Sequence, residues 1–112
     1  MKNPRQVEMV KEGASYFLPT YEVTNNGIVD GLGSMIHFCK GSTNDENIFR
    51  QEGVFTESLL TTAKLYLESV NVGEMKTEYT TEAIKNIQLA LMWIDQRRID
   101  RENRKILGTY QK

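Results

Sequence analysis

Residues 80–104 read TTEAIKNIQLALMWIDQRRIDRENR, and this stretch has the pattern of an amphipathic helix. Its main apolar stripe recurs at a spacing of three and four residues, which is typical of one helix face. The stripe consists of Ile84, Ile87, Leu91 and Ile94. Thr80 or Thr81 suits the start, because Glu82 then lies at the positive end of the helix dipole. The pattern predicts a long helix that ends near residues 104–106, before Gly108.

A second helix is predicted just upstream, over residues 56–70. Thr56 is expected to cap it, and Glu57 suits its first turn. Its apolar side chains again fall on one face, which consists of Leu59, Ala63, Tyr66 and Val70 with Leu60 and Leu67 beside it. The run Asn71-Val72-Gly73 ends this helix. We therefore expect the two helices to form an antiparallel helical hairpin over residues 56–107.

The first 34 residues are predicted to form an N-terminal extension with a short helix and a small β-hairpin. Asn3 suits the N-cap, Pro4 the first helical position and Gly13 the left-handed stop. Alternating residues over 15–30 then predict a hairpin with a primed turn at Asn26-Gly27.

Residues 35–55 are predicted as a strand and loop region. Met35–Lys40 has the composition of a strand, and Ile48–Val54 is expected to pair back onto it. The expected fold class is mainly α (α+β), with a C-terminal antiparallel helical hairpin, a short N-terminal helix and a small β-hairpin or irregular region. We expect one domain over residues 1–112, in an oligomer.

Composition excludes several functional classes. The 112 residues carry 14 Lys and Arg against 15 Asp and Glu, so a net charge of -1 argues against a polymer of DNA or RNA as partner. One cysteine and one histidine cannot assemble the usual zinc site. No apolar run is long enough to span a bilayer, and the N-terminus does not resemble a signal peptide. These features predict a cytoplasmic protein without membrane partner, metal or cofactor.

The longer helix carries apolar side chains away from its main stripe. They are Ala83, Ala90, Met92 and Trp93, and we interpret Met92 and Trp93 as core or interface residues. A helix of about 36 Å beside one of about 21 Å leaves part of its length without a partner. A helix that is apolar over such a wide arc is usually buried on two sides. Either the N-terminal segment or another protomer is expected to cover the second side.

Arg97, Arg101 and Arg104 recur at spacings of four and three, so they lie on one side of the predicted helix. Three guanidinium groups on one face suit bidentate capture of phosphate oxygens. An alternative interpretation is structural, because cations stabilise a helix C-terminus and acidic neighbours such as Asp95 and Asp100 can pair with them.

His37 and Phe38 also have two interpretations. Together they can line a pocket in which a base stacks, or His37 can be a hydrogen-bonded residue of a half-buried strand. No nucleophile, base and orienting group can be assembled along the chain. We therefore do not expect an enzyme.

The C-terminal third resembles a phage helical-hairpin family through Ala90-Leu91-Met92-Trp93, Arg97, Asp100, Arg101, Arg104 and Gly108-Thr109. Upstream, the resemblance rests on Ile36-His37-Phe38 with Gly41, on Gly53-Val54 and on Glu57-Ser58-Leu59-Leu60, and it covers roughly residues 35–110. The family includes anti-CBASS and anti-Thoeris proteins, which sequester the cyclic nucleotide signals of bacterial immunity.

The resemblance implies a phage sponge protein that acts in the cytoplasm of an infected bacterium. Such a homo-oligomer, often a hexamer, holds cyclic di- or trinucleotides or related signalling nucleotides between chains without cleaving them. The implied ligand-binding residues are Arg97, Arg101, Arg104, Thr109, His37 and Phe38, with Tyr110 as an alternative aromatic group. The rival hypothesis is a phage-encoded structural or interaction oligomer that binds a host protein and uses its arginines for salt bridges between chains.

Overall fold

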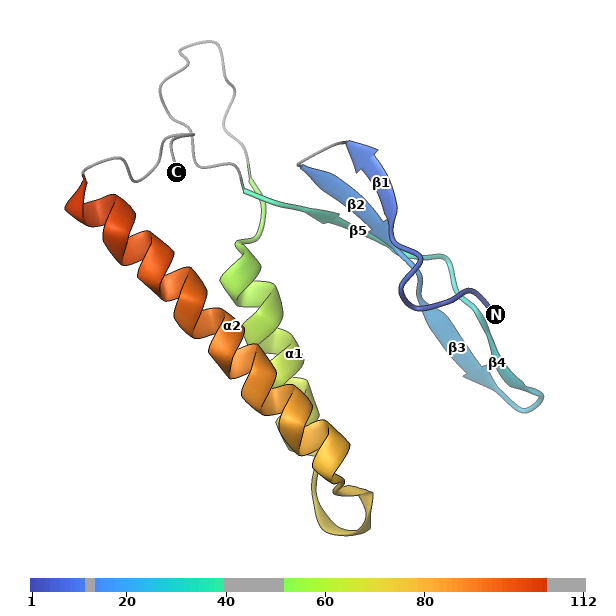
Figure 1. The fold of residues 1–112 in the computed structure, drawn as a ribbon. Helices are drawn as coiled ribbons and strands as arrows, with labels where there is room; N and C mark the ends of the chain where they lie inside the picture. The colour runs from blue at the N-terminus through green and yellow to red at the C-terminus, as the bar shows by residue number, and fades with distance from the viewer. Residues whose placement is uncertain (12–13, 40–51, 105–112) are drawn as a thin grey trace. The chain divides into compact units, whose positions relative to one another are not determined.

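A computed structural model describes residues 1–11, 14–39 and 52–104. The chain forms two compact units (Figure 1). The N-terminal unit holds the described residues up to 39 together with residues 52–54, and the C-terminal unit begins at Phe55.

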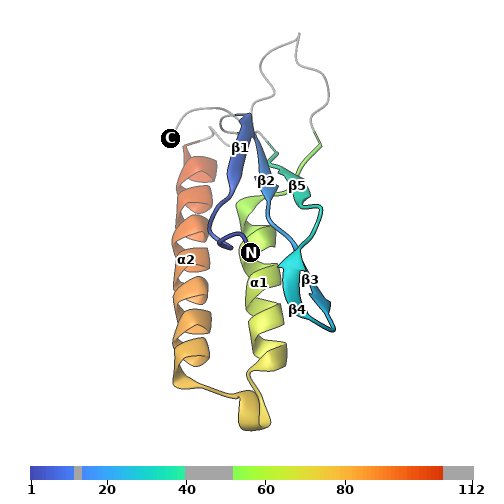
Figure 2. The same ribbon diagram turned by 90° about the vertical axis from the view of Figure 1, so that its right-hand side faces the viewer.

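The C-terminal unit consists of two helices and a short connection. Helix α1 spans Thr56–Val70, the 3-10 turn η1 spans Gly73–Met75, and α2 spans Glu78–Asn103. Both ribbon views show α1 and α2 side by side (Figures 1 and 2). The half-buried apolar side chains recur at helical spacing along each helix: Leu59, Leu60 and Leu67 on α1, and Ile84, Ile87, Leu91 and Ile94 on α2. We call these seven residues the apolar seam.

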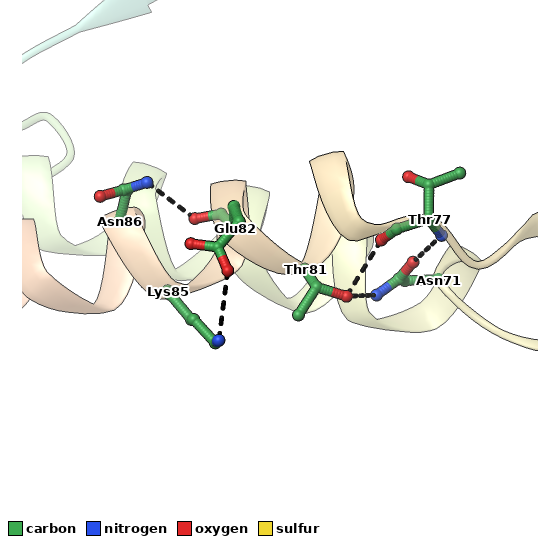
Figure 3. A network of polar contacts seen from close by, with 6 residues as sticks. All are labelled: Asn71, Thr77, Thr81, Glu82, Lys85 and Asn86. Carbon is green, nitrogen blue, oxygen red and sulfur yellow. Dashed lines mark hydrogen bonds and ion pairs between the residues drawn. The ribbon is translucent and has the colours of Figure 1, made fainter.

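A polar network fixes the connection between the two helices (Figure 3). The backbone N–H of Thr77 donates to Asn71 Oδ1 at 3.0 Å, and Asn71 Nδ2 donates to Thr81 Oγ1 at 3.0 Å. The Thr81 hydroxyl in turn donates to the Thr77 carbonyl at 3.0 Å. Thr77 is also the N-cap of α2, because its side-chain oxygen accepts the Thr80 N–H at 3.1 Å. Asn71 therefore joins the end of one helix to the start of the next.

The sequence placed two helix starts imprecisely. Thr56 was expected to cap α1, but Phe55 occupies the cap position and makes no side-chain hydrogen bond there. The start of α2 was expected at Thr80 or Thr81, yet the helix begins at Glu78. Thr77 was overlooked because the threonines that follow it offer equally good capping side chains.

Replacing Asn71 by alanine is expected to lower the free energy of unfolding of the C-terminal unit by about 1–2 kcal/mol, because one half-buried and one exposed hydrogen bond are lost. Thermal denaturation followed by helical circular dichroism measures the change. Asn86→Ala is the control, since the exposed Asn86 amide donates only to the Glu82 carbonyl one turn earlier. Equal effects of the two substitutions would contradict this role of Asn71.

The N-terminal unit consists of two small antiparallel sheets. Strands β1 (Glu8–Lys11), β2 (Ser15–Leu18) and β5 (Ser34–His37) form a three-stranded sheet in the order β1-β2-β5. Strands β3 (Tyr21–Thr24) and β4 (Gly27–Asp30) form a separate two-stranded sheet.

The predicted fold class is wrong. The structure has two helices and five antiparallel strands in two sheets, and all five strands precede the helices. In place of the expected N-terminal helix, Asn3 and Pro4 begin a single turn, in which Asn3 Oδ1 accepts the Arg5 N–H at 2.9 Å. The chain then continues into β1, since pairing with β2 outweighs the weak local preference for a helix.

The predicted hairpin over residues 15–30 is shorter and has a different turn. Only β3 and β4 form it, with Thr24 opposite Gly27, so the turn residues are Asn25 and Asn26 rather than Asn26 and Gly27. The Thr24 hydroxyl accepts the Asn26 N–H and donates to the Gly27 carbonyl, which closes the turn one residue earlier. Gly27 is the first residue of β4 and has a φ of 112°.

Apolar burial is shallow throughout the described residues. Within the described ranges, no hydrophobic side chain is buried, and Ser15, at 9% exposure, is the one buried polar residue. No helix in this part of the chain is long and apolar enough to cross a membrane. Both units therefore leave much of their apolar surface open to solvent.

Tyr21 ties the N-terminal segment to the β3–β4 sheet. Its hydroxyl donates to the Lys2 carbonyl at 2.6 Å, and the Lys2 N–H donates to Asp30 Oδ1 at 2.8 Å. Desolvation, and then the negative charge of Asp30, raise the pKa of Tyr21 above its ordinary value of 10.0.

Alkaline pH is expected to release this segment. A raised pKa in the folded chain means that the unfolded chain loses the proton first, so stability present at neutral pH falls as the pH rises through the pKa of Tyr21. Denaturation of wild type and Tyr21→Phe at neutral and at strongly alkaline pH measures this effect. The free energy of unfolding should fall less between the two pH values in Tyr21→Phe than in wild type. Tyr79→Phe, at an 89% exposed position, is the control and should behave as wild type. A fall in the free energy of unfolding as large in Tyr21→Phe as in wild type would contradict this mechanism.

Candidate functional site

The last turns of α2 carry the predicted arginine cluster. Arg97, Arg101 and Arg104 lie within an arc of about 60°, because each residue of a helix turns by about 100°. Arg97 is exposed and Arg101 is half-buried. Arg104 is the C-cap residue, and its side chain is 52% exposed. The helix thus places three guanidinium groups along one side of its C-terminal end.

Two acidic side chains engage arginines of this helix. Arg104 pairs with Asp100 at 2.8 Å, and Arg98 pairs with Asp95 at 3.7 Å. All four side chains are about half exposed, so each pair contributes at most about 1 kcal/mol and is weak enough for a phosphate to displace. Within the described part of the chain, Arg97 makes no ion pair.

The electrostatic balance of the cluster is only slightly positive. Residues 95–104 contain four arginines and three acidic residues, a difference of one positive charge. The helix C-terminus opposes this with a partial charge of about −0.5. Long-range attraction of an anion is therefore weak, and capture of a phosphate here depends on short-range, bidentate contacts with individual guanidinium groups.

His37 belongs to the N-terminal unit, where it pairs across strands with Ser15. The Ser15 hydroxyl and His37 Nδ1 are hydrogen-bonded at 2.7 Å, and this bond satisfies the buried hydroxyl of Ser15. Of the two interpretations of His37, this contact favours the hydrogen-bonded strand residue. The other ring nitrogen is left for solvent or a ligand, because the His37 residue is exposed.

Phe38 follows at the end of the same strand and is half-buried. Its ring meets Tyr16 edge to face, with the ring centroids 5.7 Å apart and an interplanar angle of 80°. Its backbone N–H donates to the Ala14 carbonyl at 2.7 Å. The ring therefore already has an aromatic partner, and a base would have to stack on its remaining face.

The expected pairing of Ile48–Val54 with the preceding strand is observed at one residue of the described part, Val54. Phe38 and Val54 form a parallel bridge, with Cys39 N–H donating to the Val54 carbonyl at 2.9 Å and Val54 N–H to the His37 carbonyl at 2.8 Å. Gly53 permits this approach, since a Cβ there would lie 2.6 Å from Cys39 N and 2.7 Å from the His37 carbonyl oxygen. Residues 48–51 of that prediction lie outside the described residues.

Gly53→Ala is expected to open this bridge, because a methyl group cannot fit against backbone atoms without moving them. Hydrogen exchange by NMR should then be roughly fivefold faster or more at the amides of Cys39 and Val54, for a cost of about 1–3 kcal/mol. Glu52→Ala, at an exposed neighbouring position, is the control and should leave both amides protected. Unchanged protection in Gly53→Ala would contradict the close approach.

The predicted site residues do not form one described site. His37 and Phe38 belong to the N-terminal unit and the three arginines to the C-terminal unit, whereas Thr109 and Tyr110 lie outside the described residues. Among the residues that the structure describes, no group of three or more His, Cys, Asp or Glu side chains is placed to hold a metal ion.

A small hollow in the N-terminal unit is lined partly by Lys2, Thr20, Asp30 and Gly31. Its volume of about 40 Å³ holds a few water molecules at most. A pocket for a drug-sized ligand needs on the order of 300 Å³ or more. This hollow is therefore too small for a cyclic nucleotide.

Trp93 was interpreted as a core or interface residue, and the structure leaves it 65% exposed. It lies one turn before Arg97, so the indole and that guanidinium group emerge on neighbouring parts of α2. Its position away from the main apolar stripe was the signal in the sequence that could have predicted this exposure. The neighbouring Met92, also away from that stripe, is 47% exposed.

Comparison with known proteins adds no family assignment. No protein-family model matches the chain, and no curated protein matches it significantly.

Proposed function

We propose that the protein is a phage anti-defence protein that binds cyclic nucleotide immune signals and sequesters them without cleavage in the cytoplasm of the infected bacterium. The observation that carries the proposal is the cluster of Arg97, Arg101 and Arg104 on one side of α2, in which Arg97 is exposed and makes no ion pair among the described residues. The sequence resemblance to sponge proteins supplies the class of ligand.

The chemistry of the ligand matches these side chains. A cyclic di- or trinucleotide carries one negative charge at each phosphodiester, and a guanidinium group offers a planar fork of donors for two phosphate oxygens. Arg97 is available for such a contact without breaking an ion pair in the described part of the chain. Arg104 would exchange its exposed pair with Asp100 for a phosphate.

The pocket is proposed to lie between chains of a homo-oligomer, with a hexamer as the assembly that the resemblance implies. A single face of one helix cannot enclose a nucleotide, and the hollow in the N-terminal unit is too small for one. Walls from a second chain would supply the missing enclosure. Rigid helices on both sides would also limit the ordering cost of binding, which favours tight association and slow release.

A second candidate function is a structural or interaction oligomer that binds a host protein. It is favoured by the ion pairs of Arg98 with Asp95 and Arg104 with Asp100, which give part of the arginine set a structural role. The two candidates differ in one observable property, because only the first predicts saturable binding of a cyclic nucleotide.

A thermal-shift panel of cyclic dinucleotides, cyclic trinucleotides and cyclic ADP-ribose products tests the proposal. A ligand at 100 times its dissociation constant should add about 2.7 kcal/mol to the apparent stability, and chromatography should recover it intact. No shift with any member would favour the host-protein candidate. A shift followed by recovery of a cleaved nucleotide would contradict sequestration.

Arginine variants locate the site. Arg97→Ala, Arg101→Ala and Arg104→Ala should each weaken binding of the identified nucleotide about tenfold or more, because a charge-assisted hydrogen bond contributes about 1.5–3 kcal/mol. Isothermal titration measures the affinity. Arg98→Ala is the matched control, since Arg98 belongs to the same helix but pairs with Asp95 and lies outside the cluster. Equal losses in all four variants would indicate a general charge effect rather than a site.

A further inference from the structure

The side of α2 turned away from the apolar seam carries a second row of large apolar side chains. Its members are Leu89, Met92, Trp93 and Ile99, with exposed fractions of 47%, 47%, 65% and 43%. Met92 and Trp93 follow Leu89 by three and four residues, and Ile99 follows Met92 by seven, so the four side chains lie along one side of the helix. We call these four residues the outer strip.

The exposed area of the outer strip matches that of a protein interface. A large apolar or aromatic side chain has on the order of 200 Å² of surface, so the four exposed fractions amount to roughly 400 Å² for each chain. A standard interface buries about 800 Å² on each partner, of which about 57%, or roughly 450 Å², is apolar. The outer strip alone therefore provides nearly all the apolar area that a stable dimer needs.

The charges beside the outer strip indicate which occupant fits. The N-terminal half of this side carries Glu78 and the Glu82–Lys85 ion pair, a net charge of −1. The C-terminal half carries Arg97 and the Arg104–Asp100 ion pair, a net charge of +1. A parallel copy of α2 would place like charges together. An antiparallel copy places the arginines of each chain beside the glutamates of the other, which is the complementarity expected of a two-fold axis.

The position of the tryptophan agrees with this arrangement. Helix α2 runs from Glu78 to Asn103, so its midpoint lies between Ala90 and Leu91. A two-fold axis near the midpoint brings the Leu89 of each chain close to the Trp93 of the other. Tryptophan near the centre of an interface, with charged residues at its rim, is the usual arrangement of an energetic hot spot.

We propose that a second copy of this chain docks on the outer strip, antiparallel and two-fold, with Trp93 as its anchor. The proposal names the interface of the homo-oligomer and rests on the proposed function only for the statement that the nucleotide pocket lies between chains. It requires an even number of chains in solution. The outer strip is then buried in the assembly. The arginines lie at its exposed rim beside glutamates of the other chain, where a phosphate can replace a carboxylate.

Light scattering coupled to size-exclusion chromatography of the full chain, without nucleotide, tests the interface. Wild type should elute at an even multiple of the 12.9 kDa chain mass. Trp93→Ala should raise the dissociation constant at least tenfold and shift the mass toward the single chain. Tyr66→Ala is the matched control, because Tyr66 is a 64% exposed aromatic residue on α1, outside the outer strip, and it should leave the mass unchanged.

Two further measurements keep the proposal falsifiable if Trp93→Ala alters the fold. Trp93 is the single tryptophan, so wild-type emission should be blue-shifted at high concentration and shift to the red on dilution. Arg97→Glu should weaken assembly, and the double variant Glu82→Arg/Arg97→Glu should restore it. Both measurements report assembly alone, so a failed nucleotide panel would leave them interpretable.

The outcomes that overturn the interface are distinct. A monomeric wild type, an odd number of chains, or a Trp93→Ala variant that assembles like wild type would each exclude it. If the protein is a monomer and its Trp93 emission is blue-shifted at every concentration, another part of the same chain covers the outer strip. Failure of nucleotide binding with the assembly intact would instead overturn the proposed function.

Discussion

The apolar seam between α1 and α2 determines which side of α2 is left facing away from its neighbour. Ile84, Ile87, Leu91 and Ile94 use one stripe of α2 for contact with its neighbour, and helical geometry then turns the remaining residues away. Trp93 and Arg97 are exposed for this reason. The outer surface on which both proposals rest is thus a consequence of the seam.

The seam is shallow, and this limits what a single chain can stabilise. No hydrophobic side chain among the described residues is buried, so the usual central core of a small domain is absent from this part of the chain. Local polar contacts at the junctions supplement it, notably the Asn71 network between the helices and the tie from Tyr21 to Lys2. Further apolar burial has to come from another surface, which is the physical basis for proposing self-association.

The positions of the two helices were predictable because their signals are local and repeated. The expected apolar face of α1 was wrong, since Ala63, Tyr66 and Val70 are exposed and the half-buried leucines are Leu59, Leu60 and Leu67. Four isoleucine and leucine positions at helical spacing located α2, and Asn71-Val72-Gly73 marked the end of α1 to within a residue. The N-terminal half could not be predicted in the same way, because Asn3 and Pro4 suit a helix start and a simple turn equally well. The choice between them is made by pairing with β2, a contact between segments that a local pattern does not show. The hairpin turn was misplaced by one residue for a similar reason, since the decisive contact is the side chain of Thr24.

The position of the three arginines on one side of α2 could be predicted from their spacing. The contacts that other candidate site residues make could not. Nothing in the sequence joins His37 to Ser15 or Phe38 to Tyr16, because strand register determines these contacts. Trp93 was noticed as lying away from the main stripe, but its exposure required the structure.

Native mass spectrometry of the protein purified from bacteria that synthesise cyclic nucleotides tests both assembly and sequestration, because one spectrum reports chain number and bound mass. We expect an even-numbered assembly that carries intact cyclic nucleotide and releases it unchanged on denaturation. A single chain without ligand, or an assembly that carries only a linear cleavage product, would contradict it.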